Sequence, residues 1–279
     1  MESFEVKLLA TAGDPQLIAT AGALGCFEEN SSGEILQNLL ILSGEERDKK
    51  CKAVLKNSFG MGHGSVGDQG YFIFSIENLP RAATLQLCLP EFASHLQQSL
   101  RRAKPERGFY LPEVIKNHRI FGPLANDILS ETFAFYEEMT KAGIPGEDAR
   151  YPLPLYTKTN IQTALNAREL CHLWYMTYKD GVPHIVKDVI GIMVHLAKEK
   201  APFLFNDFGF NYESLAWYPS SQLFSQNNRT MKNLIQKFGT RDVEMIGQPM
   251  LNAVITAETI HEAVRNRNEA ELANLKHVH

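Results

Sequence analysis

Hydroxyl, amide and guanidinium side chains are concentrated between residues 94 and 102. This segment reads S-H-L-Q-Q-S-L-R-R and includes Gln97, Ser99 and Arg101. Such groups can hold an oxyanion through several short, charge-assisted hydrogen bonds. Ser99 and Arg101 are two positions apart, so an extended backbone would place both on the same side of the chain. The pattern predicts an anion site, and the alternative is a polar surface turn after a buried helix.

The apolar residues before this segment predict the element that positions it. Ala82 to Cys88 is apolar enough to form a buried helix, and Pro90 follows. Proline cannot continue a helix, and it biases the preceding Leu89 towards extended geometry. We therefore expect a core helix that ends at Pro90 and delivers the polar residues on an extended segment.

Further polar candidates lie at Arg150 and in the run N-A-R-E-L-C-H, which begins at Asn166. Asn166 is predicted to cap a helix that extends to Tyr178, with Arg168 in its first turn. A cation at a helix N-terminus is electrostatically unfavourable, because this end of the macrodipole is positive. Arg168 therefore indicates either a bound anion or an ion pair with Glu169 or Asp148.

A glycine-rich segment, G-M-G-H-G-S, spans residues 60 to 65 and is predicted to be a flexible loop. Three glycines in it allow the backbone to approach a ligand closely. His63 lies within this segment, and it is either a ligand-contacting residue or a loop histidine that bonds to the backbone.

These motifs together resemble the flavin-dependent thymidylate synthases. The signature of that family, R-H-R-x-x-S-x-N-E-x-S-x-R, follows an apolar helix. Ser94, Ser99 and Arg101 match its fixed positions, and Gln97 is a common variant of its Glu. The order of the other elements also matches: H-G-S-V, an aromatic strand, A-R-x-x-L-P around Arg150, and N-A-R at the start of a helix.

The resemblance implies two groups of site residues. In the family, one group holds a nucleotide and its phosphate, and here it comprises Gln97, Ser99, Arg101 and Arg150. The other group approaches the flavin or the base, and here it comprises His63, Ser65, Asn166, Arg168 and His172. No catalytic residue is assigned.

The chain departs from the family at the opening triplet, where Leu89, Pro90 and Glu91 replace Arg-His-Arg. In the family this triplet lies against the flavin and guards access of the folate. Met176-Thr177 also stands where the family has a Leu-Arg pair that polarises the uracil ring. Each lost guanidinium removes a bond to a charged group worth roughly 1.5–3 kcal/mol. The chain is therefore predicted to be a diverged member.

The implied function is binding of a dUMP- or UMP-like pyrimidine nucleotide, with transfer of a one-carbon unit to C5 of its base. The family implies FAD as cofactor, a folate as one-carbon donor, and a homotetramer with sites between subunits. The alternative is a flavin-free paralogue with a different reaction, or with a nucleotide-binding or structural role.

Composition excludes several other classes of function. The net charge of −4 argues against a general nucleic-acid binder. No C-x-x-C or H-x-x-x-H spacing predicts a metal site. No apolar run approaches the length of a membrane span, and no signal-peptide pattern is present. Four scattered cysteines indicate free thiols, so a cytoplasmic location is predicted.

The predicted fold class is α+β, with a central, mostly antiparallel sheet flanked by helices. Strands are expected near residues 4–10, 70–78, 107–111 and up to 163. Helices are expected near 15–25, 32–42, 45–59, 121–142 and 182–200. Residues 1–218 are predicted to form the thymidylate synthase-like domain, and residues 219–279 a helical C-terminal extension.

Overall fold

The computed structural model describes residues 4–177 and 182–205. The chain divides into two compact units, Met1–Asn211 and Tyr212–His279. The predicted helical extension, residues 219–279, lies outside the described residues, and a domain boundary at residue 218 stays a prediction.

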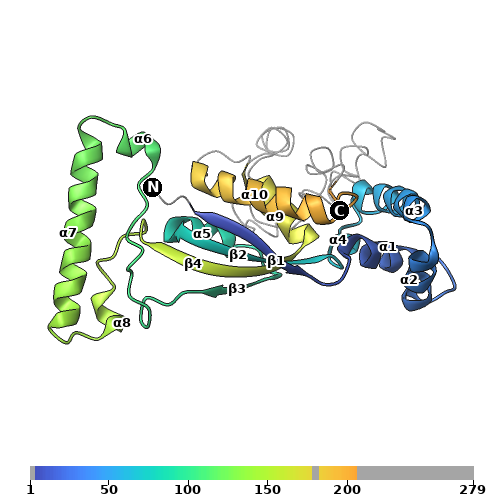
Figure 1. Ribbon diagram of the computed structural model, residues 1–279, viewed down its shortest axis with the longest axis horizontal. Coiled ribbons are helices and arrows are strands. Elements are labelled where there is room, and N and C mark those ends of the chain that lie inside the picture. The colour runs from blue at the N-terminus through green and yellow to red at the C-terminus, as the bar shows by residue number, and fades with distance from the viewer. Residues whose placement is uncertain (1–3, 178–181, 206–279) are drawn as a thin grey trace, which may run out of the picture. The chain divides into compact units, whose positions relative to one another are not determined.

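A four-stranded antiparallel sheet forms the centre of the first unit, with the strand order β1-β2-β4-β3. Its strands are β1 (Glu5–Thr11), β2 (Tyr71–Pro80), β3 (Ala93–Gln97) and β4 (Lys158–Asn166). Helices lie along one face of this sheet (Figure 1). The prediction of an α+β fold with an antiparallel sheet is confirmed.

Alternation of side chains explains how the sheet buries one face. Phe72, Phe74 and Ile76 of β2 are fully buried, whereas the residues between them are partly exposed or exposed. Side chains in a strand alternate between faces, so this pattern gives β2 a single apolar face. The helices α5 (Arg81–Leu87), α9 (Ala167–Met176) and α10 (His184–Lys200) pack on the sheet.

Three helices form a smaller core of their own after β1. They are α1 (Pro15–Gly25), α2 (Ser32–Ile41) and α3 (Gly44–Asn57). Asp14 caps α1 as predicted, because its carboxylate accepts from the backbone N–H groups of Gln16 and Leu17. Capping boxes begin α2 and α3, at Ser31 and Ser43. Local cap chemistry therefore sets where these helices begin.

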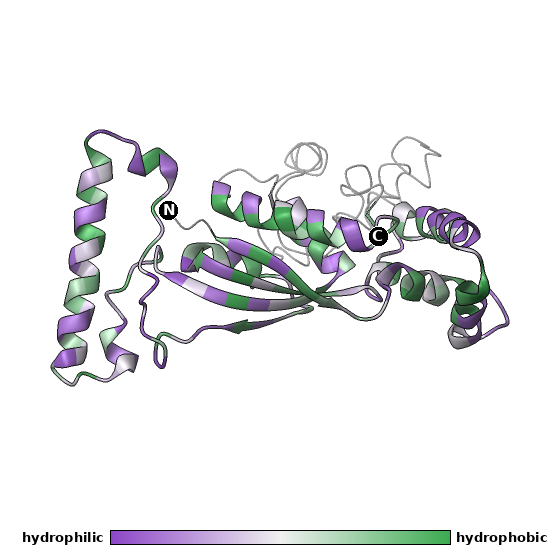
Figure 2. Ribbon diagram, in the orientation of Figure 1, coloured by the Kyte–Doolittle hydropathy of each residue, from purple (hydrophilic) through white to green (hydrophobic). Residues whose placement is uncertain are grey.

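Helix α7 (Phe121–Lys141) lies at one end of the sheet, between the short helices α6 (Glu113–Lys116) and α8 (Gly146–Ala149) (Figure 1). Figure 2 shows hydrophobic and hydrophilic residues alternating along it. Leu129 and Tyr136 are buried, but Leu124, Ile128 and Phe135 are exposed. One apolar stripe of α7 is thus uncovered in the single chain.

Three predicted segments differ from the structure. The predicted extended segment from Ser99 to Arg101 is wrong, because β3 ends at Gln97 and the Ser99 carbonyl then closes a turn by accepting from Arg102 N–H and Ala103 N–H. The predicted strand at 107–111 is a single bridge between Phe109 and Thr157. The glycine-rich segment contains a 3₁₀ turn, Phe59–Met61, and the start of α4 (Gly64–Gly67).

None of the helices in the described part of the chain is long and apolar enough to cross a membrane.

Candidate functional site

The first group of site residues surrounds the start of α5. The backbone N–H groups of Arg81 and Ala82 donate to the carbonyls of Thr157 and Leu155, so α5 is anchored to the segment between α8 and β4. Gln97, at the end of β3, donates from Nε2 to Thr84 Oγ1 on α5 over 3.0 Å. The Gln97 side chain therefore points to the side of the sheet on which α5 lies.

Ser99 organises the turn that carries Arg101. Its Oγ accepts from the backbone N–H of Arg101 over 3.3 Å. The Arg101 carbonyl lies against Gly146, where an added Cβ would be 3.0 Å from that oxygen. Gly146 begins α8 and Arg150 follows its last residue, so the turn and the segment of Arg150 lie side by side. The structure thus brings together the segments of all four residues assigned to the nucleotide.

Arg81 belongs to the same group, although sequence reasoning did not select it as a site residue. Its side chain is half-buried, and its Nη1 donates to the Gln98 carbonyl over 3.5 Å. Burial lowers the pKa of Arg81 from its ordinary value, and the positive charge of Arg150 lowers it further. The two guanidiniums therefore lie within each other's field. Arg168 was selected from the sequence because it lies in the first turn of a helix, where a cation is unfavourable. Arg81 is the first residue of α5, so the same criterion would have selected it.

The arginines of this group make their contacts without a carboxylate partner in the described residues. Within the described ranges, Arg81, Arg101 and Arg150 have no ion pair with a carboxylate. Arg150 instead donates from Nε to the Glu147 carbonyl and lies over the Tyr151 ring. The like charges of Arg81 and Arg150 repel each other when no anion lies between them. An oxyanion bound among them would remove this repulsion and gain charge-assisted bonds.

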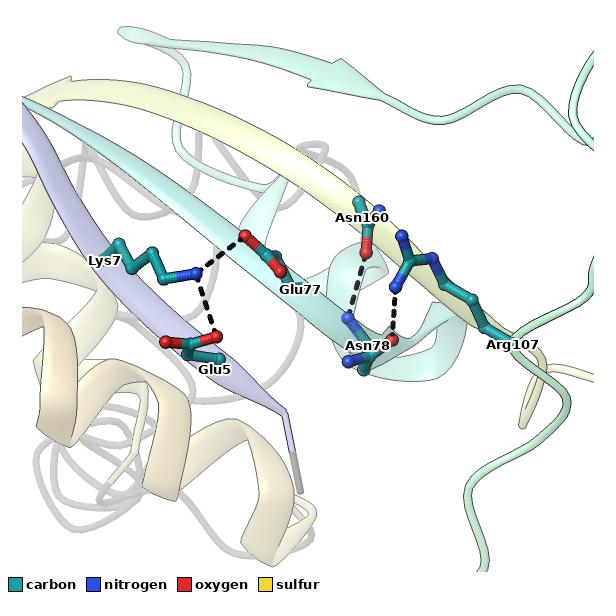
Figure 3. Close-up of polar contacts among 6 residues, drawn as sticks. All are labelled: Glu5, Lys7, Glu77, Asn78, Arg107 and Asn160. Atoms are coloured by element: carbon teal, nitrogen blue, oxygen red, sulfur yellow. Dashed lines mark hydrogen bonds and ion pairs between the residues drawn. The ribbon is translucent and has the colours of Figure 1, made fainter. Parts of the chain in front are cut away.

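A strained asparagine connects the segments of this group (Figure 3). Asn78 has φ of 59° at the point where the β2–β4 register shifts. Its backbone N–H donates to Asn160 Oδ1 over 3.0 Å, and its Oδ1 accepts from Arg107 Nη1 over 2.9 Å (Figure 3). The Asn160 carbonyl accepts from Gln98 N–H. Asn78 thereby connects the end of β2, which precedes Arg81, with two other segments. It is linked through Asn160 to Gln98, which precedes Ser99, and through its own side chain to Arg107, which follows Arg101.

Replacement of Asn78 tests the role of its left-handed backbone. Asn78→Ala is expected to destabilise the fold by roughly 1–2 kcal/mol more than Asn78→Gly, because a left-handed conformation costs that much for a residue with a Cβ. Both variants lose the hydrogen bond to Arg107, so the difference between their stabilities measures the cost of the left-handed backbone conformation. Urea unfolding of the two variants measures the difference. Equal stabilities would show that the backbone conformation is not the source of the effect.

The second group lies at the other end of β2 and β4. His63 precedes α4, Ser65 is within it, and the Arg168 side chain packs on Gly64, where a Cβ would be 2.8 Å from Nε. Arg168 Nη1 is paired with Asp68 Oδ2 over 3.1 Å. The predicted ion pair of Arg168 with Glu169 or Asp148 is therefore wrong. The arginine side chain extends across Gly64 to the residue that follows α4.

Asn166 caps α9 as predicted and accepts from Glu169 N–H over 2.8 Å. Glu169 is not a surface residue, because its side chain is 0% exposed. Its Oε2 lies 3.7 Å from Nδ1 of His172, whose side chain is 19% exposed. The structure therefore gathers His63, Ser65, Asn166 and Arg168 at the contact of α4 with α9, with His172 one turn further along α9.

The triplet position also lies at this end of the sheet. Leu89 and Glu91 are exposed and Pro90 is buried. The next strand, β3, begins with Ala93 opposite Leu165, the residue before Asn166. Residues 89–91 are thus near the second group, and they bring a carboxylate to it and no cation.

The two groups are separated along β4. Arg81 is bonded to Thr157, just before this strand, and Asn166 is its last residue. A nine-residue strand spans roughly 26 Å from its first residue to its last. The structure therefore assembles each group but holds the start of α5 far from the cap of α9.

A family model described as thymidylate synthase complementing protein, Thy1, matches residues 7–203, which include both groups. The chain belongs to this family. Its similarity to curated members is moderate. A flavin-dependent thymidylate synthase of Geobacter sulfurreducens is 28% identical over 74% of this chain and 87% of that protein. The enzyme of the same name from Thermococcus onnurineus is 31% identical over 67% of this chain and 76% of that protein.

A solved structure shares the fold of this family member. The crystal structure of PolB from Streptomyces cacaoi, a UMP/dUMP methylase bound with 5-Br dUMP, superposes with a TM-score of 0.61. It is 16% identical, and the match covers 75% of this chain and 95% of PolB. This likeness confirms the predicted fold.

Because curated members of the family are named for a flavin, the second group can be compared with that cofactor. Its imidazole, hydroxyl and amide side chains fit the hydrogen-bonding edge of a flavin ring. Its charge does not fit the cofactor's phosphates: among described residues 63–68, 89–91 and 166–172, Arg168 is the one Arg or Lys and is paired with Asp68. No group of three potential metal ligands occurs in the described part of the chain.

Proposed function

We propose that this chain binds a pyrimidine nucleotide, dUMP- or UMP-like, and acts in the transfer of a one-carbon unit to C5 of its base. The observation that carries the proposal is the pair of Arg81 and Arg150, which lie within each other's field, beside the turn that carries Arg101. A phosphate carries two negative charges and suits planar guanidinium donors. The names of the curated relatives and the brominated nucleotide bound by PolB support the same ligand class.

The residues of the first group would bind the nucleotide at both ends. The arginines and the Ser99 hydroxyl donate to phosphate oxygens. Gln97 donates from Nε2 to Thr84, which orients its amide so that Oε1 can accept from a ring N–H. Each bond to a charged group contributes roughly 1.5–3 kcal/mol. Three arginines therefore dominate the affinity of this site.

The hydrogen-bonding residues of the second group, His63, Ser65, Asn166, Arg168 and His172, would hold the ring of FAD. A bound flavin would supply the reducing equivalents for the transfer, with a folate as the one-carbon donor. Glu91 stands where the family has a cation, so we expect weaker binding of the electron-rich reduced cofactor and of an acidic folate than in relatives with Arg-His-Arg. The chain provides hydrogen bonds here, and little positive charge.

The second candidate function is a flavin-free paralogue that keeps the nucleotide site. The residues Leu89, Pro90 and Glu91 and the Arg168–Asp68 pair favour it, because they leave the second group short of cations. Purified protein separates the two candidates. Yellow flavin absorbance supports the first candidate, and colourless protein stabilised by dUMP or UMP supports the second. No thermal response to either nucleotide would contradict both.

We also propose that the chain works as a homo-oligomer, a tetramer by family resemblance. The two groups lie near opposite ends of β4, so a nucleotide held at Arg81 is too short to reach Asn166 of the same chain. Another copy of the chain could place its second group next to the first group of this copy. The uncovered stripe of α7 offers apolar surface for such contacts.

The four free cysteines suit a reducing, cytoplasmic location.

Calorimetry with dUMP, UMP and inorganic phosphate tests the nucleotide proposal directly. We expect both nucleotides to bind, and phosphate to bind more weakly and to compete with them. Affinity should fall as salt is added, because the arginine–phosphate attraction is screened. Binding that is independent of both phosphate and salt would contradict the assignment of the first group.

A further inference from the structure

A cavity lies between α7 and the segment that follows the turn at Ser99. Its volume is about 370 Å³, which is within the range of pockets that bind small molecules. The segment contributes residues 104–106 to the lining, and α7 contributes five residues between Phe133 and Lys141. None of these residues belongs to either group of site residues. The cavity is therefore a separate candidate site.

One side of α7 forms a wall of this cavity. The lining positions 133, 136, 137, 140 and 141 follow the spacing that places residues on one face of a helix. The exposed apolar stripe with Ile128 and Phe135 follows another side of α7. The Phe133 ring packs on the ring of Phe109, with the two centroids 5.7 Å apart. A subunit contact at the stripe would therefore leave an ordered aromatic wall open to a ligand.

Tyr136 brings an unused hydroxyl to this wall. The residue is 5% exposed, and Pro105 on the opposite wall is buried too. The Tyr136 carbonyl accepts from Thr140 Oγ1, but its hydroxyl has no hydrogen-bond partner among the described residues. This oxygen is not sealed from solvent, so it opens onto the cavity that Tyr136 lines. A single polar group on an apolar surface is the feature that orients a ligand in a pocket.

The other wall of the cavity is rich in cations. Residues 99–108 contain four Arg or Lys side chains and one carboxylate, Glu106. On α7, Glu137 is already paired with Lys141, 3.7 Å away. Lys104 is exposed, lines the cavity and has no ion pair with a described carboxylate. The balance of charge therefore favours an anionic substituent beside Lys104.

We propose that this cavity binds a small aromatic carboxylate. The ring of the ligand packs on Phe133 and Tyr136 in the offset or edge-to-face geometry that aromatic pairs adopt. The Tyr136 hydroxyl exchanges a hydrogen bond with a polar atom of that ring, and the carboxylate lies at Lys104. Burial of the ring supplies most of the affinity, because an exposed ion pair contributes little. The inference does not depend on the proposed nucleotide binding, since the two sites share no residue.

Calorimetry with three indole compounds tests the charge preference of the cavity. Indole-3-acetate, indole-3-acetamide and tryptamine carry the same ring with a negative, a neutral and a positive substituent. We expect the acetate to bind most tightly and tryptamine most weakly. Lys104→Gln should weaken binding of the acetate about twofold to fivefold and leave that of the acetamide unchanged. Tightest binding of tryptamine, or no binding of any of the three, would overturn the proposal.

Tyr136→Phe tests the hydroxyl, because it keeps the ring and removes one oxygen. The affinity for indole-3-acetate is expected to fall about fivefold. The melting temperature should stay the same or rise, since the hydroxyl has no partner to lose in the described part of the chain. Lys52→Gln, at an exposed position of α3, should bind as the wild type does. A lower melting temperature with unchanged affinity would show a merely structural role and contradict the proposal.

Two further measurements locate the binding site. Thr140→Leu adds volume to the lining and should weaken binding of all three indole compounds, so unchanged binding would place them elsewhere. Saturating dUMP should leave the affinity for indole-3-acetate unchanged. Displacement of indole-3-acetate by dUMP would assign it to the first group and overturn the inference. Failure of dUMP to bind at all would contradict the proposed function alone, because the indole titrations do not require the nucleotide.

Discussion

Arg150→Ala is expected to weaken dUMP binding by at least about tenfold while the fold survives. The Arg150 guanidinium is close enough to Arg81 to lower its pKa, and it has no carboxylate partner in the described residues. Loss of one or two bonds to phosphate removes roughly 1.5–3 kcal/mol each, which corresponds to about a tenfold to hundredfold loss of affinity per bond. Arg101→Ala should have the same effect. Calorimetry measures the affinity, and circular dichroism the fold.

Arg119 provides the control for these substitutions. It is an exposed arginine between α6 and α7, outside the first group, and Arg119→Ala changes the net charge equally. This variant should bind dUMP as the wild type does. Arg81→Ala should weaken binding without lowering stability, because it removes a half-buried cation that Arg150 opposes. Unchanged dUMP affinity in both Arg101→Ala and Arg150→Ala would refute the phosphate assignment.

Lysine substitutions on the exposed stripe of α7 are expected to dissociate the oligomer. Phe121, Leu124, Ile128 and Phe135 are half exposed and follow one side of the helix. Burial of each in a subunit contact contributes roughly 1.5–3 kcal/mol, and a buried lysine reverses that gain. Ile128→Lys combined with Phe135→Lys should therefore give monomers in sedimentation velocity.

A control pair on another side of α7 makes this test specific. Ser130 and Ala134 are exposed, and replacing both with lysine adds the same charge away from the stripe. That variant should keep the assembly state of the wild type. The monomeric variant should also lose flavin affinity if a second copy completes the site. A double substitution on the stripe that leaves the oligomer intact would place the subunit contact elsewhere.

Local patterns in the sequence determined most of the elements of this protein. Asp14 followed by Pro15 marked the start of α1, and the alternation around Phe72 and Phe74 marked β2. Asn166 marked the cap of α9. Caps and alternation act over a few residues, so they can be read without the fold. The motif residues around Ser99 and Asn166 were also identified from the sequence.

The tertiary structure alone decided how those residues are used. Arg168 is paired with Asp68, a hundred positions earlier, and Arg81 lies in the field of Arg150. Glu169 was a predicted ion-pair partner of Arg168 and is buried instead, and the turn at Ser99 replaced a predicted extended segment. These outcomes depend on which distant segments pack together. Local propensity carries no information about such contacts, and neither does it show that the two groups lie near opposite ends of one strand.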